Sequence, residues 1–502
     1  MTALASRILT LNPADDVGIV LADLARGAET AGNLRARNSI RAGHKIALRA
    51  IAKGTPVRKY GQVIGLASQD IQPGDHVHTH NLAFGGQARI LPSNYANAPP
   101  PQSSTATFMG YARKEGRAGT RNYIGILTSV NCSATVARKI AAAFEHEPMP
   151  EGLDGVCAFT HTTGCGTASQ SEGVDNLTRT VMGYARHSNF AAVILIGLGC
   201  EVNQIDRMLK ESGLAESSRL HTFTIQEEGG TLTAIERGKA LVRELIAEHA
   251  GTQRVPVPAS DLMVGLQCGG SDGWSGLTAN PSLGAAADLI AAQGGTAILS
   301  ETPEIYGAES LLLSRAVSAD VAAKLIERLD WWEAYAARHG ASLNNNPSPG
   351  NLEGGLTTIL EKSLGAIAKS GTSPLMGIYR YGEPIHQPGF VFMDSPGYDP
   401  CSATGQIASG ANLIAFTTGR GSVFGSKPAP CLKLASNAKL ARHMAEDMDI
   451  DCSPVAEGTS TFEMGELIFA RMLAIASGGP TRSEALGMGD HEFVPWQIGA
   501  WM

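Results

Sequence analysis

The sequence predicts a multidomain α/β protein that begins with a small β domain, and three observations support this. Short β-type runs alternate with turn signals over residues 8–95. A Pro/Ser-rich stretch, ANAPPPQSSTAT, follows at 96–107 and is typical of a linker. Beyond residue 111, apolar runs alternate with helical patterns, as they do when strands form a parallel sheet.

Each domain is expected to contain a defined set of elements. In the N-terminal domain we expect strands at 17–21, 45–48, 57–59 and 63–67. In the middle domain we expect strands at 124–130, 155–159 and 191–196 and helices at 135–144 and 176–185. In the last domain we expect strands at 261–266, 296–299, 389–393 and 412–417 and an alanine-rich helix at about 280–293.

The domain boundaries follow from the linker and from two prolines. Pro256 and Pro258 interrupt the chain after a long helical pattern that ends near His249. The sequence therefore predicts domains at 1–95, 111–255 and 256–502, with a linker at 96–110.

Composition limits the partners. The 502 residues carry a net charge of −7 and no basic run, so nucleic acid and anionic membranes are not expected as partners. No apolar stretch reaches about 18 residues and the start lacks an apolar signal region, so we expect a cytoplasmic protein. The eight cysteines never form CxxC, and we expect thiols, core residues or metal ligands rather than disulfides.

The richest chemistry lies in the stretch 265–273, GLQCGGSDG. It places a thiol, a hydroxyl and a carboxylate (Cys268, Ser271 and Asp272) in a glycine-rich turn after a predicted strand. Such turns are where open α/β sheets bind ligands. The alternative is a tight turn that contains a buried cysteine.

Two further cysteines, Cys165 and Cys200, also lie next to glycine and after predicted strands. With Cys268 they either converge on one pocket or belong to two different domains. His161 lies in the same loop as Cys165.

Several polar residues are candidates for binding an anionic substrate. Arg121 and Asn122 lie in a glycine-containing turn, where arginine suits a carboxylate or an interface salt bridge. His78 and His80, at i and i+2, share a face if the segment is extended, suited to a metal or an anion, or are plain surface residues. His44 is a third imidazole that can join them from a neighbouring turn. Later polar loops and helices add Asn346, Lys362, Thr418, Arg420 and Lys433.

A set of motifs resembles the altronate/galactarate dehydratase family, most of all its altronate-type members. The motifs occur in order from about residue 10 to 440: GHKIAL, KYGQVIG, VHTHN, GTRNY, HTTGCG, IGLGCE, QCGGSDGWSG, ANPSLG, NNPSPGN, EKSLG and FTTGRGS. By contrast, the sequence has no GxxxxGK[ST] and no GxGxxG between a strand and a helix, which disfavours a nucleotide cofactor.

The resemblance implies a fold and a reaction. It implies an N-terminal β-clip (SAF-type) domain, a middle α/β domain that mediates homodimer formation, and a Rossmann-like C-terminal domain. It implies a hydro-lyase that removes water across C2–C3 of an aldonate such as D-altronate to give a 2-keto-3-deoxy acid. The alternatives are a galactarate or other aldarate dehydratase, a related sulfo-lyase, and a sugar-acid-binding protein without activity.

The resemblance also implies iron(II), with manganese(II) as an alternative. The iron is either a single ion on mixed ligands, which we favour, or a [4Fe–4S] cluster on Cys165, Cys200 and Cys268. Removal of a proton next to a carboxylate requires strong electrostatic stabilisation, which a metal and an arginine can supply.

Roles for individual residues complete this hypothesis. Lys362 or His161 is the expected base, and Asp272 a catalytic residue and metal ligand together with the thiols. Arg121 and Arg420 are expected to bind the substrate carboxylate. The other expected substrate-binding residues are Asn122, Ser271, Asn346, Thr418, Lys433, His78 and His80.

Overall fold

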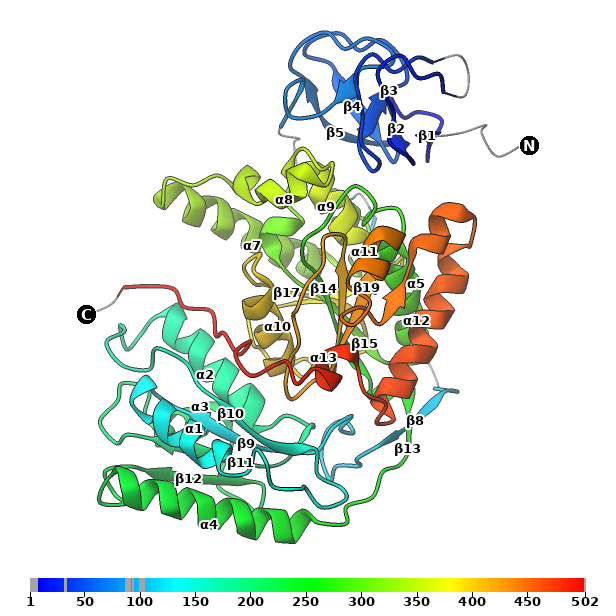
Figure 1. Ribbon diagram of the computed structural model, residues 1–502. Helices are drawn as coiled ribbons and strands as arrows, with labels where there is room; N and C mark the ends of the chain where they lie inside the picture. Colours follow the sequence, from blue (N-terminus) through cyan, green and yellow to red (C-terminus); the bar gives the residue numbers. More distant parts are fainter. Residues whose placement is uncertain (1–7, 31–33, 86–91, 93, 99–103, 501–502) are drawn as a thin grey trace.

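The computed structural model describes residues 8–30, 34–85, 92, 94–98 and 104–500. In Figure 1 an N-terminal β module lies at the top, the C-terminal α/β domain in the centre, and the middle α/β domain at the bottom. The multidomain α/β architecture with parallel sheets is confirmed. Among the described residues, no helix is both long and apolar enough to cross a membrane.

The β module consists of two small antiparallel sheets with the strand orders β1-β2-β3-β6 and β4-β5-β7. Tyr60 and Gly61 join β4 to β5 and both have positive φ (62° and 70°), as a two-residue hairpin turn requires. The strands are β1 (Ile8–Leu9), β2 (Val17–Val20), β3 (Lys45–Ala47), β4 (Pro56–Lys59), β5 (Gln62–Ala67), β6 (His76–Val77) and β7 (Leu82–Ala83).

The middle domain is a parallel sheet of four strands in the order β10-β9-β11-β12, with helices on both faces. Alternate residues of β9 face different cores: Ile124 and Ile126 pack with α1 and α4, and Leu127 packs with α2 and α3. The elements are β9 (Tyr123–Thr128), α1 (Ala134–Ala142), β10 (Gly155–Phe159), α2 (Glu172–Ala185), β11 (Phe190–Gly197), α3 (Ile205–Ser212), β12 (Leu220–Thr224) and α4 (Thr231–His249).

The C-terminal domain is built on a seven-stranded parallel sheet in the order β16-β17-β15-β14-β18-β19-β20. Helices α5, α9 and α12 cover one face, and α10 packs on the other, where it also contacts α2 of the middle domain. Its strands are β14 (Met263–Cys268), β15 (Thr296–Leu299), β16 (Leu375–Tyr379), β17 (Gly389–Met393), β18 (Leu413–Thr418), β19 (Cys431–Ala435) and β20 (Ile450–Asp451). Its helices are α5 (Ala279–Ala292), α6 (Ser310–Leu313), α7 (Ala319–Arg338), α8 (Pro349–Glu353), α9 (Ile359–Ala368), α10 (Asp399–Ala408), α11 (Ala438–His443), α12 (Thr461–Ala476) and α13 (Arg482–Ala485).

The strand order reverses at β14. The chain first adds β15, β16 and β17 on one side of β14 and then places β18, β19 and β20 on the other side. In such sheets the carboxyl ends of the strands at the reversal form a crevice that binds ligands. The loops after β14, β15, β17 and β18 therefore define the expected position of a site.

Part of the predicted linker is a strand. Thr107–Gly110 forms β8 and pairs antiparallel with β13 (Val255–Pro258), where Phe108 is buried against Val257. The prolines at 256 and 258 were expected to interrupt the chain, but an edge ribbon tolerates proline because one side of each strand needs no hydrogen bonds. Within the linker, residues 99–103 lie outside the described residues.

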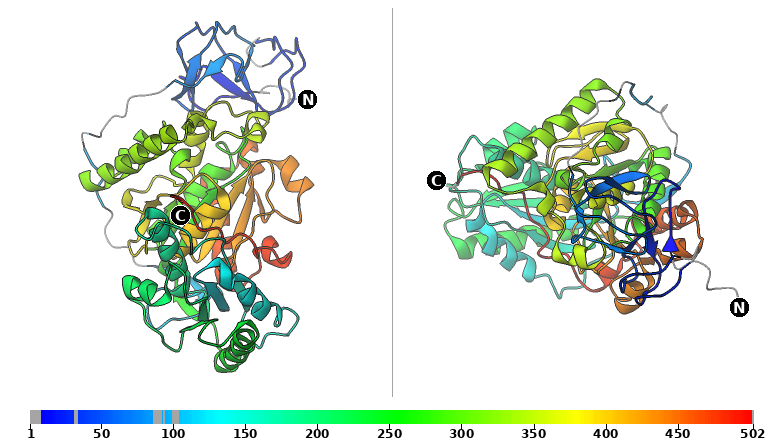
Figure 2. Two further views of the ribbon diagram at one scale, coloured as in Figure 1. Left: turned by 90° about the vertical axis from the view of Figure 1, so that its left-hand side faces the viewer. Right: turned by 90° about the horizontal axis from the view of Figure 1, so that it is seen from above.

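The β module is seated over the carboxyl edge of the C-terminal sheet (Figure 2). A buried ion triad fixes it there: Glu361 on α9 accepts from Lys45 Nζ at 2.8 Å and from Lys59 Nζ at 2.9 Å. The amide and hydroxyl of Thr357 also donate to this carboxylate. Burial alone raises the pKa of Glu361, but the two ammonium groups outweigh it and hold this pKa well below its ordinary value.

Glu361→Gln is expected to destabilise the protein by about 3–5 kcal/mol, because it leaves two buried ammonium groups without a counter-charge. Urea unfolding measures this difference. Glu236→Gln, which removes an exposed partner of Lys239, is the control and should change stability by less than about 0.5 kcal/mol. Equal effects of the two variants would contradict a structural role for the triad.

The same carboxylate predicts an acid-sensitive fold. Because its folded pKa is depressed, Glu361 contributes stability above its ordinary pKa of 4.5, and this contribution is lost as pH falls through the folded pKa. The stability difference between the native protein and Glu361→Gln should therefore shrink below about pH 4.5. Melting temperatures over an acid pH series measure this, and a difference that stays constant contradicts it.

Candidate active site

Acidic, thiol and amino side chains meet at the carboxyl edge of the C-terminal sheet. Cys268 is the last residue of β14, and Glu301 and Glu304 follow β15 directly. The ligand atoms of these three buried side chains lie within 4.8 Å of one another. The arrangement joins one soft and two hard donors, a set suited to a divalent transition metal.

Glu301 is held in an unusual state. Its backbone is left-handed, with φ of 71°, although it is not glycine. Both carboxylate oxygens are buried and accept no hydrogen bond within the described part of the chain, and Lys369 Nζ lies 3.9 Å from Oε2. Burial, followed by repulsion from Glu304, raises its pKa well above the usual range. A strained, buried carboxylate without hydrogen bonds indicates a binding site for a cation or substrate.

Lys362 on α9 and Lys369, the residue that caps the carboxyl end of α9, complete the cluster. Lys369 Nζ donates to Cys268 Sγ at 2.9 Å, while burial raises the pKa of this thiol to about 12. Lys362 Nζ donates to Glu304 Oε1 and to Asn346 Oδ1, both at 2.7 Å. Burial lowers the pKa of Lys362, but Glu304 outweighs it, so the net effect raises the pKa and the amine stays protonated.

Asp399, at the start of α10, is a further member of this site. Its carboxylate lies so close to the backbone after Cys268 that a Cβ on Gly269 would be 2.2 Å from Oδ2. Burial and the charge of Glu304 raise the pKa of Asp399 to about 7. Such a group is suited to accept and return a proton at neutral pH.

The sequence predicted some of this site and missed the rest. The structure brings together three residues that were separate candidates, Cys268, Lys362 and Asn346. Glu301, Glu304, Lys369 and Asp399 were missed, although Glu301 follows a correctly predicted strand. Its position directly after that strand was the signal that could have identified it.

Asp272 does not belong to the metal-ligand group. Its Oδ1 accepts from Trp274 N, from the amide and hydroxyl of Ser275 and from Ser436 Oγ, and its Oδ2 accepts from Asn437 Nδ2. The expectation that Asp272 binds metal is therefore corrected: it organises the loop after β14. The carbonyl of the neighbouring Ser271 accepts from Asn351 and is part of the same loop structure.

Arg121 and Asn122 are structural, in contrast to their expected substrate-binding role. Arg121 is buried and its five N–H groups all have partners, two of them on Glu484 and three on backbone carbonyls. Asn122 donates to Gly152 O and accepts from Arg113. Both precede β9, at the amino ends of the strands, away from the edge where parallel sheets bind ligands.

His161 is also structural rather than a base. It is buried in the middle domain, where Nε2 bonds to Thr128 O and Nδ1 accepts from Thr163 N. Burial lowers its pKa to about 4. Both ring nitrogens are thus occupied by backbone groups.

Of the two alternatives for Cys165, Cys200 and Cys268, the structure shows the one with two different domains. Cys165 and Cys200 follow β10 and β11 in the middle sheet and are exposed, whereas Cys268 is buried in the C-terminal sheet. The glycine-flanked pattern recurs in both sheets, so it indicated equivalent positions but not a common domain.

Histidines of the β module line another opening, which lies between the module and the C-terminal domain. His44 Nδ1 lies 3.0 Å from His76 Nε2, and His78 stacks on both rings, with His80 against His76. A cavity of about 300 Å³ is lined by Ser39, Arg41, His44, His76, His78, Leu352 and Glu353. Burial is the main cause that lowers the pKa of His44 to about 4 and of His76 to about 3.

Arg420 flanks this opening, and two other predicted residues support its loop. Arg420 is partly exposed and pairs with Glu353 Oε2 at 2.9 Å. Thr418 and Lys433 are buried: Thr418 Oγ1 accepts from Gly421 N, and Lys433 Nζ donates to Ser422 O. They therefore hold the loop that carries Arg420 rather than facing a ligand.

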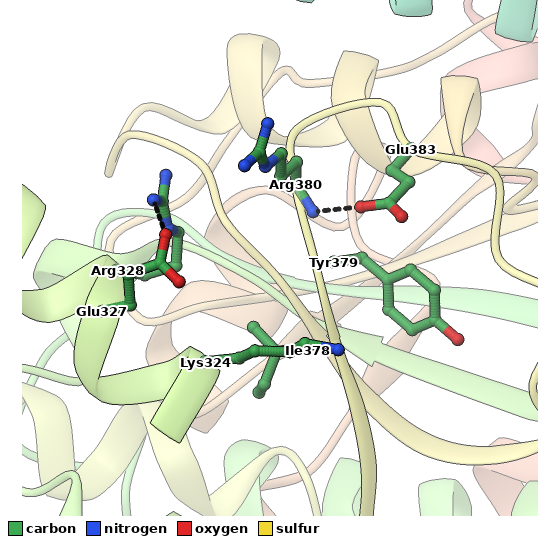
Figure 3. Close-up of a pocket in the computed structure, with 7 residues that line it drawn as sticks. All are labelled: Lys324, Glu327, Arg328, Ile378, Tyr379, Arg380 and Glu383. Carbon is green, nitrogen blue, oxygen red and sulfur yellow. Dashed lines mark hydrogen bonds and ion pairs between the residues drawn. The ribbon is translucent and has the colours of Figure 1, made fainter. Parts of the chain in front are cut away.

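A second cavity, of about 180 Å³, contains none of the predicted residues. Figure 3 shows its lining from α7, β16 and the following turn. Arg328 lies 3.8 Å from Asp394, which also accepts from Trp332. The lining residues are Lys324, Glu327, Arg328, Ile378, Tyr379, Arg380 and Glu383.

Comparison with known proteins identifies the family along almost the entire chain. Residues 6–84 match the altronate/galactarate dehydratase SAF domain, 110–250 the D-galactarate dehydratase/altronate hydrolase second domain, and 259–501 the D-galactarate/altronate dehydratase C-terminal domain. Altronate dehydratase of Escherichia coli (strain K12) is 36% identical over 486 residues, covering 95% of this chain and 96% of the relative.

Two other relatives are similar at comparable length. Altronate dehydratase of Bacillus subtilis (strain 168) is 34% identical, covering 94% of this chain and 95% of the relative. Galactarate dehydratase (L-threo-forming) of Escherichia coli (strain K12) is also 34% identical, covering 94% of this chain and 92% of the relative. The chain therefore belongs to the altronate/galactarate dehydratase family.

Proposed function

We propose that this chain is a hydro-lyase that removes water across C2–C3 of an aldonate such as D-altronate and gives a 2-keto-3-deoxy acid. The observation that carries the proposal is the cluster of Cys268, Glu301 and Glu304 beside two buried lysines. The dehydratases among its relatives support the same class of reaction.

The donor set at this cluster fits iron(II). A cation there would satisfy the two carboxylate oxygens of Glu301 and favour the thiolate of Cys268. The thiolate favours iron over manganese(II), which is the alternative. When bound, iron supplies Lewis-acid stabilisation of the negative charge that develops on substrate oxygens.

The residues around the cluster can carry the proton transfers. The Asp399 carboxylate takes the C2 proton, and the electron pair of the C–H bond becomes the C2–C3 double bond. The C3–O bond breaks, and the leaving oxygen takes a proton from the Lys362 ammonium and departs as water. The resulting enol gives the 2-keto acid as its C2 hydroxyl proton returns to Lys362 and C3 takes the proton held by Asp399. Because Glu304 keeps Lys362 protonated, we assign Lys362 as an acid in place of its expected role as the base.

The remote end of the substrate is assigned to the opening beneath the β module. Arg420 offers a guanidinium that can exchange Glu353 for a substrate carboxylate, and His80 is an imidazole partner for hydroxyl groups. His78 was expected to bind substrate too, but its ring nitrogens already bond to Leu352 O and Thr79 Oγ1, so it supports the wall of the opening. Asn346 and Ser271 lie on loops that connect the cluster of Cys268, Glu301 and Glu304 with this opening. Stereochemical selection among sugar acids depends on such hydrogen bonds.

Several broader features belong to the same proposal. We infer a homodimer formed through the middle domain, a cytoplasmic location, and a C-terminal domain that is a Rossmann-like variant. A small-molecule sugar acid is the partner, without nucleic acid or membrane. The competing functions are a galactarate or other aldarate dehydratase, a sulfo-lyase, and binding of sugar acids without turnover.

Anaerobic protein supplied with iron(II) is expected to form a 2-keto-3-deoxy acid from altronate, and removal of iron by a chelator should abolish the product. A panel of aldonic and aldaric acids, read by product formation, measures this. Product from galactarate alone would keep the mechanism and change the substrate. Sulfite from sulfolactate would favour the sulfo-lyase, and binding without product from any acid would favour a binding protein.

Asp399→Asn is expected to lower kcat by about 10²–10⁴-fold with a small change in KM, because the amide cannot accept the C2 proton. Steady-state kinetics and exchange of the C2 proton with solvent measure the effect. Asp320→Asn, on the exposed face of α7, is the matched control and should keep native rates. Retention of C2 proton exchange in Asp399→Asn would assign the base elsewhere.

Cys268→Ser and Glu301→Gln are expected to weaken iron(II) binding at least about tenfold, because each removes a charged ligand of the cluster. Equilibrium dialysis under anaerobic conditions, without added sulfide, measures the bound iron. Cys452→Ser replaces a buried cysteine outside the cluster and should leave the affinity unchanged. Native affinity in both variants would exclude this cluster as the iron site.

A further inference from the structure

Three cysteines lie at one edge of the middle sheet, apart from the site described above. The neighbouring strands β10, β9 and β11 are parallel, and each is followed by a loop with one cysteine: Cys165, Cys132 and Cys200. The carboxyl ends of parallel strands lie at the same edge of a sheet. The topology therefore brings together Cys165 and Cys200, which the sequence singled out, and Cys132, which it did not.

The three loops are bonded to one another. Asn131 N donates to Thr163 O at 2.8 Å, which joins the loop of Cys132 to that of Cys165. Asn203 N donates to Gly164 O at 3.1 Å, which joins the loops of Cys200 and Cys165. A Cβ on Gly164 would lie 2.3 Å from Ser129 O, so the backbones approach closely beside Cys165. The cysteines are thus presented on one fixed framework.

The exposure of these thiols separates them from every other cysteine. Cys132, Cys165 and Cys200 are exposed, whereas the other five cysteines, Cys157, Cys268, Cys401, Cys431 and Cys452, are buried. Free cysteine is among the most buried residue types, so three exposed thiols at one sheet edge indicate a function.

The three thiols are not a close metal-ligand group, which argues against a single ion bound by all of them. Among the described residues, the metal-ligand group whose atoms lie within 4.8 Å of one another is Cys268, Glu301 and Glu304, not these cysteines. A single tetrahedral metal would need sulfurs about 3.8 Å apart, as two bonds of about 2.3 Å require. In an iron–sulfur cluster each thiolate binds a different iron, so the sulfurs stand farther apart.

The local charge also suits a cluster. Helix α1 begins at Ala134, two residues after Cys132, so its amino end lies beside this residue. The positive end of a helix dipole stabilises a nearby anion. Thiolate-bound clusters are anionic.

We propose that Cys132, Cys165 and Cys200 bind a four-iron iron–sulfur cluster through three thiolates and leave one iron without a protein sulfur ligand. Each thiol gives up its proton as it binds iron. The open iron faces solvent and is available to an oxygen ligand. The proposal is independent of the proposed hydro-lyase site, because it concerns a different sheet and its test does not measure turnover.

Anaerobic reconstitution with iron(III), sulfide and dithiothreitol tests the proposal, because the thiol reduces part of the iron to the mixed iron(II)/iron(III) state of the cluster. The native chain is expected to gain visible charge-transfer absorption and about four iron and four acid-labile sulfide per chain beyond any iron bound without sulfide. Cys132→Ser, Cys165→Ser and Cys200→Ser should each lose most of the labile sulfide. Cys268→Ser should keep the labile sulfide, since Cys268 lies in the C-terminal sheet and not in the middle sheet. Circular dichroism confirms that each variant is folded.

Other outcomes of the same reconstitution would contradict the proposal. A native chain that takes up no labile sulfide, or a folded triple variant that keeps it, would overturn the proposal. Zinc bound by these cysteines in place of iron and sulfide would also overturn it and would indicate a single-ion site. Electron paramagnetic resonance of the reduced native chain gives an independent check, because a four-iron cluster then carries an unpaired spin.

Discussion

One carboxylate on α9 determines the positions of two parts of the molecule. These are the N-terminal module and the strand-edge site, which is the group of Cys268, Glu301, Glu304 and Asp399 at the carboxyl edge of the C-terminal sheet. Glu361 is fully buried between Lys45 and Lys59 of the module, while the next residue, Lys362, faces Glu304. A buried ion pair is specific because a displaced partner leaves an unpaired charge in the interior. Two neighbouring residues in the first turn of α9 therefore have different roles. Glu361 fixes the position of the module, and Lys362 directs its amine toward Glu304.

The strand-edge site buries more acidic groups than ammonium groups. Three carboxyl groups (Glu301, Glu304 and Asp399) and one thiol share a buried region with two ammonium groups. Burial opposes every one of these charges, and repulsion between the acids raises the pKa values of Glu301 and Asp399 further. A divalent cation would relieve this excess of acid, and the strained backbone of Glu301 is the conformation that holds it ready.

Much of the fold follows from local sequence patterns, and the site follows from them only in part. The strand expected at 296–299 and the helix from about 280 agree with β15 and α5, because their apolar patterns report burial directly. Arg121 was misassigned because an arginine with five internal partners and one aimed at a substrate look alike in sequence. The position of Glu301 after a predicted strand was visible in the sequence, but the positive φ and unsatisfied oxygens that mark it as a site residue are visible only in coordinates.

The long sequence separation within the Glu361 triad has a consequence for synthesis. Lys59 and Glu361 are 302 residues apart, so the ribosome needs roughly 15–60 s to supply the acid after the base. Before Glu361 is made, burial of Lys45 and Lys59 would leave both ammonium groups without a counter-charge. The module can therefore take its final seat only after the last domain has begun to emerge.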